Sequence, residues 1–158
     1  METSDEGLHA HPQSTVKIGS HPLHPMLVPF PIAFWTAAFV TDIAFVTARW
    51  WMWAYISAWL LAAGIITALL AATAGFIDFL GDRRIRRLPV ARLHLMGNVL
   101  ALVLSIANFL VHTRGGAMAF MPTGLILSGI VALLLLFNGW LGGEMVFRHG
   151  VGVSPRQE

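Results

Sequence analysis

Four long apolar stretches restrict the fold of this chain more than any other feature. They cover about residues 26–48, 54–80, 90–111 and 122–141, and each is close to or above the ~20 residues that cross a hydrocarbon core of ~30 Å. Because backbone N–H and C=O groups in lipid need partners within the chain, these stretches are predicted to be α-helices. With only 11% charged residues, the sequence predicts an all-α integral membrane protein, a four-helix transmembrane bundle.

The arginines predict how the bundle is oriented. The loop between the second and third stretches holds four of them: Arg83, Arg84, Arg86 and Arg87. The two loops on the other side carry only Arg49 and Arg114. Loops rich in positive charge remain on the cytoplasmic side, so this loop and, with four spans, both termini are expected in the cytoplasm. The same signal accounts for the net charge of +2, which therefore gives no indication of nucleic-acid binding.

The remaining sequence divides around these helices. Residues 1–20 are predicted to be a flexible polar leader, residues 21–149 the transmembrane domain and residues 150–158 a flexible tail. The absence of cysteine excludes disulfides, thiolate-held iron–sulfur clusters and covalently attached c-type haem. The sequence contains no nucleophile motif, phosphate-binding loop or metallohydrolase motif, so we expect an electron carrier or a subunit rather than a stand-alone enzyme.

Two periodic stripes predict the inward faces of the helices. On the third helix, positions spaced to share one face carry polar side chains: His94, Asn98, Ala101, Ser105, Asn108 and His112. The second helix repeats this spacing with mostly small residues, which allow helices to pack closely: Gly64, Ala68, Ala71, Gly75, Asp78 and Asp82. Both stripes are expected to face the interior of the bundle.

The acidic residues of the spans have several interpretations. Asp82 is expected to pair with the arginine loop, whereas a structural and a functional role for Asp78 both stay open. Asp42, in the first helix, is expected to pair with Arg49 or to be held protonated by burial. A proton relay through Asp42 is a further alternative. Glu144 lies four residues before Arg148, a spacing that favours an ion pair on one helix.

Histidines gather at the predicted cytoplasmic end. His21 and His24 belong to the segment HPLHP, whose prolines predict polyproline II geometry with the two imidazoles on one side, ~9 Å apart. His94 begins the third helix and His149 follows the fourth. Together with two carboxylates, these are the candidate metal ligands: His21, His24, His94, His149, Asp78 and Glu144. The alternative is that the histidines of HPLHP only cap backbone groups at the membrane interface.

Three segments resemble the bacterial membrane family known as domain of unknown function 2231: HPLHPMLVPFPIAFW, ARLHLMGN and GGEMVFRHGVGV. The resemblance covers about residues 18–153. It implies a four-helix protein of the bacterial inner membrane, sometimes fused to Rieske-type iron–sulfur domains or encoded near dehydrogenases. It also implies that His21, His24, His94 and the glycines at 142–143 are motif positions, and it leaves His112 outside the pattern.

These observations favour binding of haem b and electron transfer. Of the histidines at this end, His24 and His94 are the expected axial ligands, and His21 and His149 would form a second pair or tune the first. Arg92 and Arg148 are expected near the propionates. Partners would be the lipid bilayer and a quinone, a dehydrogenase or a Rieske-type protein, and a homo-oligomer stays open. The alternatives are a zinc, iron or copper site for transport or sensing, and a membrane anchor subunit without a cofactor.

Overall fold

The computed structural model describes residues 11–114 and 121–153 of the chain. It contains four long helices: α2 (Pro29–Ala48), α3 (Trp51–Gly81), α5 (Pro89–Arg114) and α7 (Thr123–Phe147). The short helix α1 (Leu23–Leu27) leads into α2, and α4 (Arg83–Arg87) lies between α3 and α5. The strands β1 (Lys17–Ile18) and β2 (His21–Pro22) pair antiparallel before α1. The predicted helical bundle is confirmed, and its four helices, with α1 counted in the first, are long and apolar enough to span a membrane.

Local signals set the helix boundaries. α2 ends where Arg49 adopts a left-handed conformation, with a φ of 52°, and its N–H donates to the carbonyl of Phe45. α4 begins because the Asp82 side chain accepts a hydrogen bond from the Arg84 N–H at 2.8 Å, which is an N-cap. Prolines in the first turns of α1 and α2 lack an N–H that would find no helical partner there.

The prediction of polyproline II geometry for HPLHP was wrong beyond its first two residues. His21 and Pro22 form strand β2, but Leu23–Leu27 is an α-helix. The N–H of Val28 donates to the carbonyl of His24 at 3.1 Å, which carries the helical turn toward α2. His24 therefore projects from a helix rather than from an extended stalk, because Pro25 falls within a first turn, where a missing N–H costs nothing.

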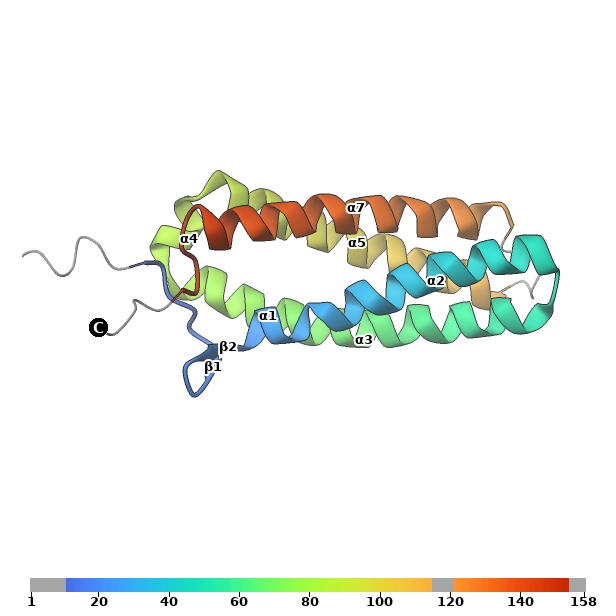
Figure 1. Cartoon of the computed structure of the whole chain (residues 1–158), viewed down its shortest axis with the longest axis horizontal. Coiled ribbons are helices and arrows are strands. Elements are labelled where there is room, and N and C mark those ends of the chain that lie inside the picture. The colour runs from blue at the N-terminus through green and yellow to red at the C-terminus, as the bar shows by residue number, and fades with distance from the viewer. Residues whose placement is uncertain (1–10, 115–120, 154–158) are drawn as a thin grey trace, which may run out of the picture.

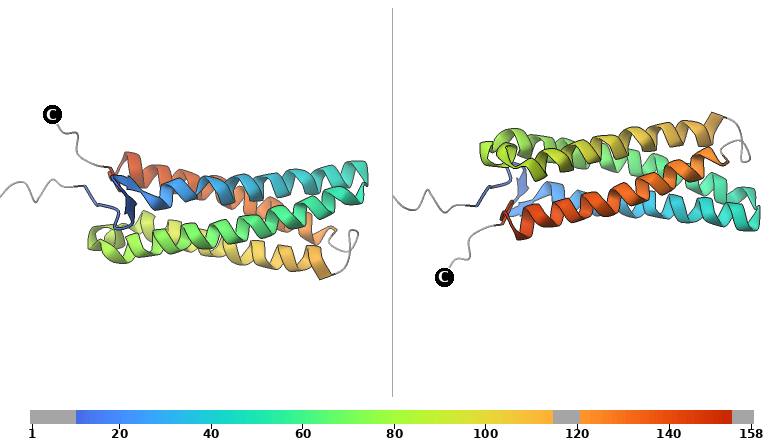
Figure 2. Two further views of the ribbon diagram at one scale, coloured as in Figure 1. Left: turned by 90° about the horizontal axis from the view of Figure 1, so that it is seen from below. Right: turned by 90° about the horizontal axis from the view of Figure 1, so that it is seen from above.

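The long helices form two antiparallel pairs, α2 with α3 and α5 with α7, which make the most extensive contacts. Figures 1 and 2 show the four helices side by side, with both described chain ends at one end of the bundle. We call this end, which carries α4, the arginine end, and the opposite end, where α2 turns into α3 at Trp50, the tryptophan end. The cytoplasmic location of the arginine end stays a prediction.

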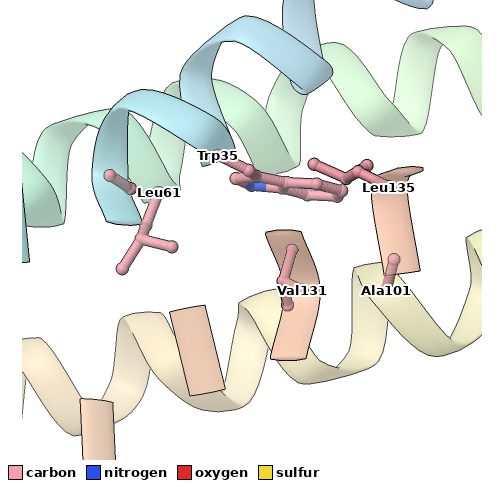
Figure 3. Close-up of a cluster of buried hydrophobic side chains, with 6 residues drawn as sticks. Trp35, Leu61, Ala101, Val131 and Leu135 are labelled. Atoms are coloured by element: carbon pink, nitrogen blue, oxygen red, sulfur yellow. The ribbon is translucent and has the colours of Figure 1, made fainter. Parts of the chain in front are cut away.

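The middle of the bundle is an apolar core. Its buried side chains come from all four long helices (Figure 3): Trp35, Ala38, Leu61, Ala101, Val131 and Leu135. The two predicted stripes face this interior: Ala101, Ser105 and Asn108 of α5 have no exposed surface, and Gly64 and Ala71 of α3 are buried. Large apolar side chains cover the outside, as a lipid-facing surface requires.

Candidate functional site

The two histidines expected to act together meet at the arginine end. His24 comes from α1 and His94 from α5, and their ring centroids lie 6.3 Å apart with the ring planes perpendicular. α1 packs against α3, whereas α5 packs chiefly against α7, and Figure 1 shows these two sides of the bundle separating toward the arginine end. The histidine pair therefore connects the two halves of the bundle where the helices diverge.

Backbone carbonyls fix the protonation of both rings. His24 Nδ1 lies 2.8 Å from the carbonyl oxygen of Ala71, and His94 Nδ1 lies 3.1 Å from that of Asn138. A carbonyl only accepts, so each Nδ1 carries the hydrogen. In a neutral imidazole this leaves the lone pair on Nε2, and the described residues give neither Nε2 atom a hydrogen-bond partner. Both histidines thus present a lone pair of the kind that binds metals.

Glycines allow the rings to lie close to neighbouring helices. A Cβ at Gly75 of α3 would lie 2.7 Å from His24 Nδ1, and one at Gly142 of α7 would lie 3.4 Å from His94 Cε1. At Gly75 any side chain would displace the imidazole. The small-residue stripe of α3 therefore leaves room for the His24 ring and also allows the helices to pack closely.

The other predicted ligands do not join this pair. His21 is exposed in β2, with its Nδ1 3.5 Å from Ser20 Oγ, and His149 follows the end of α7. Glu144 forms the predicted ion pair with Arg148 at 2.7 Å. Within residues 11–114 and 121–153, no group of three or more His, Asp or Glu side chains is arranged to hold a metal ion. The predicted six-residue set is thus not assembled as one site.

Asp78 is occupied by the segment that precedes β1. Its Oδ1 accepts hydrogen bonds from the N–H groups of Thr15 and Val16 at 2.6 and 2.9 Å, and the Ser14 hydroxyl lies 2.9 Å from each carboxylate oxygen. We call residues 12–16 the strap. These four hydrogen-bond contacts between the Asp78 carboxylate and the strap favour a structural role for Asp78.

Asp82 holds the strap one turn further on. Its Oδ2 accepts from the Gln13 N–H at 3.2 Å, and it forms the predicted ion pair with Arg84 at 2.9 Å. The hydrogen bond from the Arg84 side chain lowers the pKa of the Asp82 carboxyl below its usual value. The strap also meets the other described end of the chain, because the Gly152 N–H donates to the Pro12 carbonyl at 2.8 Å. Residues 1–10 of the predicted leader and 154–158 of the predicted tail lie outside the described residues.

The structure brings together a second polar cluster that sequence reasoning missed. At the tryptophan end, Asp42 of α2 pairs with His112 of α5 rather than with Arg49: Oδ1 lies 2.9 Å from Nε2. Ser57 of α3 donates to Oδ1 at 2.6 Å and Ser128 of α7 donates to Oδ2 at 2.5 Å. One signal was available, because His112 lies on the same inward stripe as His94. The pairing of Asp42 with His112 depends on how the helices are aligned with each other and could not be predicted from the sequence.

Comparisons with known proteins add a family to this geometry. The family described as "Predicted membrane protein (DUF2231)" matches residues 20–155, which include both histidines of the arginine end and both members of the buried pair at the tryptophan end. Among curated proteins and solved structures, none matches the chain. The match supports the membrane setting and names no ligand.

Proposed function

The chain belongs to the DUF2231 family of predicted membrane proteins, and on that footing we propose that it binds haem b through His24 and His94 and transfers electrons. One observation carries the proposal. Two imidazoles from separate helices lie with ring centroids 6.3 Å apart, and a carbonyl accepts from each Nδ1–H. This is the state of a histidine prepared to bind a metal through Nε2.

The separation of the rings is compatible with one shared metal. A metal with one Nε2 atom on each side, at a metal–nitrogen distance of about 2.0–2.1 Å, would place these two atoms roughly 4 Å apart. Rings with centroids 6.3 Å apart reach that separation when their Nε2 atoms are turned toward each other. The carbonyls of Ala71 and Asn138 hold the rings through Nδ1, which limits the entropy lost on binding.

The number of ligands favours haem over a bare ion. A protein-bound zinc ion usually takes three or four protein ligands, and the described residues offer no third histidine or carboxylate beside this pair. Haem would bring its own nitrogen ligands, so His24 and His94 would be enough to hold it. The zinc, iron or copper alternative would rest on His24 and His94 alone, since Asp78 and Glu144 have other partners.

Haem held by both imidazoles would supply a one-electron couple. The chain contributes the two ligands, their orientation and a cationic boundary for propionates. Arg92 is exposed at the start of α5, two residues before His94, and it is the better candidate for that role because Arg148 is paired with Glu144. The proposed setting is the bacterial inner membrane, with a quinone, dehydrogenase or Rieske-type protein as the redox partner near the arginine end.

Absorption spectroscopy tests the proposal. Protein expressed with adequate haem supply and purified gently should show a Soret band, and dithionite should produce a sharp α-band in the reduced-minus-oxidised spectrum. Both His24→Ala and His94→Ala should abolish these bands. His21→Ala and His149→Ala serve as matched controls, because they remove an imidazole at the same end without touching the pair, and they should retain haem.

Other outcomes identify the alternatives. Protein without a Soret band overturns haem binding. A stoichiometric transition metal in such protein, lost in His94→Ala, would favour the bare-ion alternative, and its absence would favour the anchor subunit. If the bands survive His24→Ala but disappear in His149→Ala, the ligand pair has been assigned wrongly.

A further inference from the structure

The buried pair at the tryptophan end is separate from the proposed haem ligands. The side chains of Asp42 and His112 have no exposed surface, and the polar cluster around them receives a side chain from each long helix. Ionisable groups inside a transmembrane bundle are costly and usually functional. Apolar side chains at this position in the bundle would cost less free energy than an ionisable pair. The pair therefore needs a functional explanation.

Hydrogen bonds determine how many protons the pair holds. His112 Nδ1 lies 3.0 Å from the Asn108 carbonyl, so it carries a hydrogen. Ser128 accepts from the Asn108 side-chain amide at 2.7 Å and donates its own hydrogen to Asp42 Oδ2. A favourable contact of 2.9 Å between Oδ1 and Nε2 then requires one proton between them. That proton resides either on the carboxyl or on the imidazole.

The net charge of the pair depends on this proton. With the proton present, the pair is neutral overall, either as two neutral groups or as an ion pair. Without it, a carboxylate would face an imidazole lone pair and the site would carry a net charge of −1 in surroundings of low dielectric. A second proton would leave a net charge of +1. Uncompensated buried charge is expensive, so the site is built around a single proton.

The other titratable groups near this pair in sequence lie at the surface. Arg49, Tyr55 and Arg114 are the other titratable residues near the tryptophan end in sequence; all three are exposed, and no hydrogen bond or ion pair joins any of them to Asp42 among the described contacts. Residues 115–120 contain no titratable side chain. Both serines and Asn108 are neutral, so the proton balance of the cluster depends on Asp42 and His112.

A groove brings the surface close to one member of the pair. It has a volume of about 440 Å³ and lies between α3 and α5, with Trp51, Tyr55, Trp59 and His112 among its lining residues. The apolar core of Trp35, Leu61 and their neighbours (Figure 3) separates the pair from the arginine end, because Trp35 precedes Asp42 on α2 and Ala101 precedes His112 on α5. His112, and not Asp42, lines the groove, but its imidazole has no exposed surface, so a proton from the surface would reach the pair through a transient opening beside His112.

We propose that Asp42 and His112 form a proton-binding site that takes up and releases one proton per chain as a unit. On release, the proton leaves the space between Oδ1 and Nε2 for solvent, and a neutral imidazole and a carboxylate remain; the carboxylate is stabilised by the hydrogen bonds that it accepts from Ser57 and Ser128. On uptake, the same proton restores the 2.9 Å hydrogen bond. The proposal does not depend on haem, because neither residue contacts His24 or His94.

Infrared difference spectroscopy on the purified full-length protein tests this site. Spectra recorded as pH is changed, with ¹⁵N-labelled histidine for assignment, should show one carboxyl and one imidazole signal that change together at one midpoint. Asp42→Asn and His112→Gln should each abolish both signals. Asp82→Asn is the matched control, because it removes an acid at the opposite end, and it should leave both signals. A potentiometric titration of wild type and Asp42→Asn should differ by one proton per chain.

Several results would overturn the proposal: separate midpoints for the two signals, a carboxyl signal that persists in Asp42→Asn, or no change over the pH range in which the protein stays folded. If Asp42→Asn and His112→Gln fail to fold, the proposal is tested with Ser57→Ala instead. It keeps the acid and the base but removes the 2.6 Å donor to Oδ1. The paired signals should then persist with a displaced midpoint, and an unchanged midpoint would count against the site.

Discussion

Replacing Gly64 by alanine should destabilise the bundle although it adds a single methyl group. Gly64 of α3 faces the indole of Trp35, and a Cβ there would overlap its Nε1 and Cδ1 atoms and lie 3.0 Å from Cε2. The indole is 3% exposed and packed against Leu61, Val131 and Leu135, so it has no space into which to move. Overpacking of this kind costs about 1–3 kcal/mol.

Gly139→Ala is the matched control for this change. Gly139 lies inside α7, and a Cβ there would meet nothing within 4 Å. Both substitutions gain the ~0.5–1 kcal/mol by which alanine exceeds glycine in a helix, so their difference isolates the overpacking term. We expect Gly64→Ala to be less stable than Gly139→Ala by about 1–3 kcal/mol.

The assay is reversible unfolding in mixed micelles, followed by circular dichroism of the helices. The free energies of unfolding of wild type and both variants should rank Gly139→Ala first, wild type second and Gly64→Ala last. If Gly64→Ala equals or exceeds Gly139→Ala in stability, the contact between α3 and Trp35 is not as close as described, and the inward orientation of the small-residue stripe must be revised.

Further predictions concern the arginine end. Gly75→Ala should displace the His24 ring, because its Cβ would lie 2.7 Å from Nδ1; it should lower haem content, whereas Gly139→Ala should not, and equal haem content would contradict the contact. Reporter fusions at either terminus should behave as cytoplasmic, and alkaline phosphatase activity from a C-terminal fusion would refute the topology. The pKa of Asp82 is lowered by Arg84, so this carboxylate stabilises the folded state above its unfolded pKa and loses that effect as pH falls through its folded pKa. Acid should therefore lower the protection of the strap amides against hydrogen exchange, measured relative to their intrinsic exchange rate at each pH, and the loss of protection should be smaller in Asp82→Asn.

The apolar runs and the stripes could be predicted from the sequence because each of them depends on one helix alone. The four apolar runs predicted helices whose ends lie within about three residues of those observed, except that α7 continues past the predicted residue 141 to Phe147. The stripe of α5 predicted which face is buried. The ion pairs of Asp82 and Glu144 were also predicted, since their partners lie two and four residues away. These features follow from local geometry alone.

Contacts between distant segments were not readable. Asp42 and His112 are 70 positions apart, and their pairing depends on how α2 and α5 are aligned along the bundle axis. The strap was missed for a related reason: Asp78 binds backbone N–H groups of Thr15 and Val16, which every residue except proline offers. The helical geometry of His24 was missed because the prolines were taken to indicate extended backbone. In the first turn of a helix, however, proline is tolerated.

The junction between the strap and the end of the chain sets an order of assembly. Gln13 donates to the carbonyl of Val153 across 140 positions of sequence, and Pro12 accepts from Gly152. A ribosome adding about 5–20 residues per second needs roughly 7–28 s to cover that separation. Throughout this interval the first helix is already made while the strap still lacks its last partners. The arginine end therefore closes only after the fourth span has been synthesised, so a chain that stops before α7 is complete would leave this end of the bundle unsealed and recognisable to quality-control proteases.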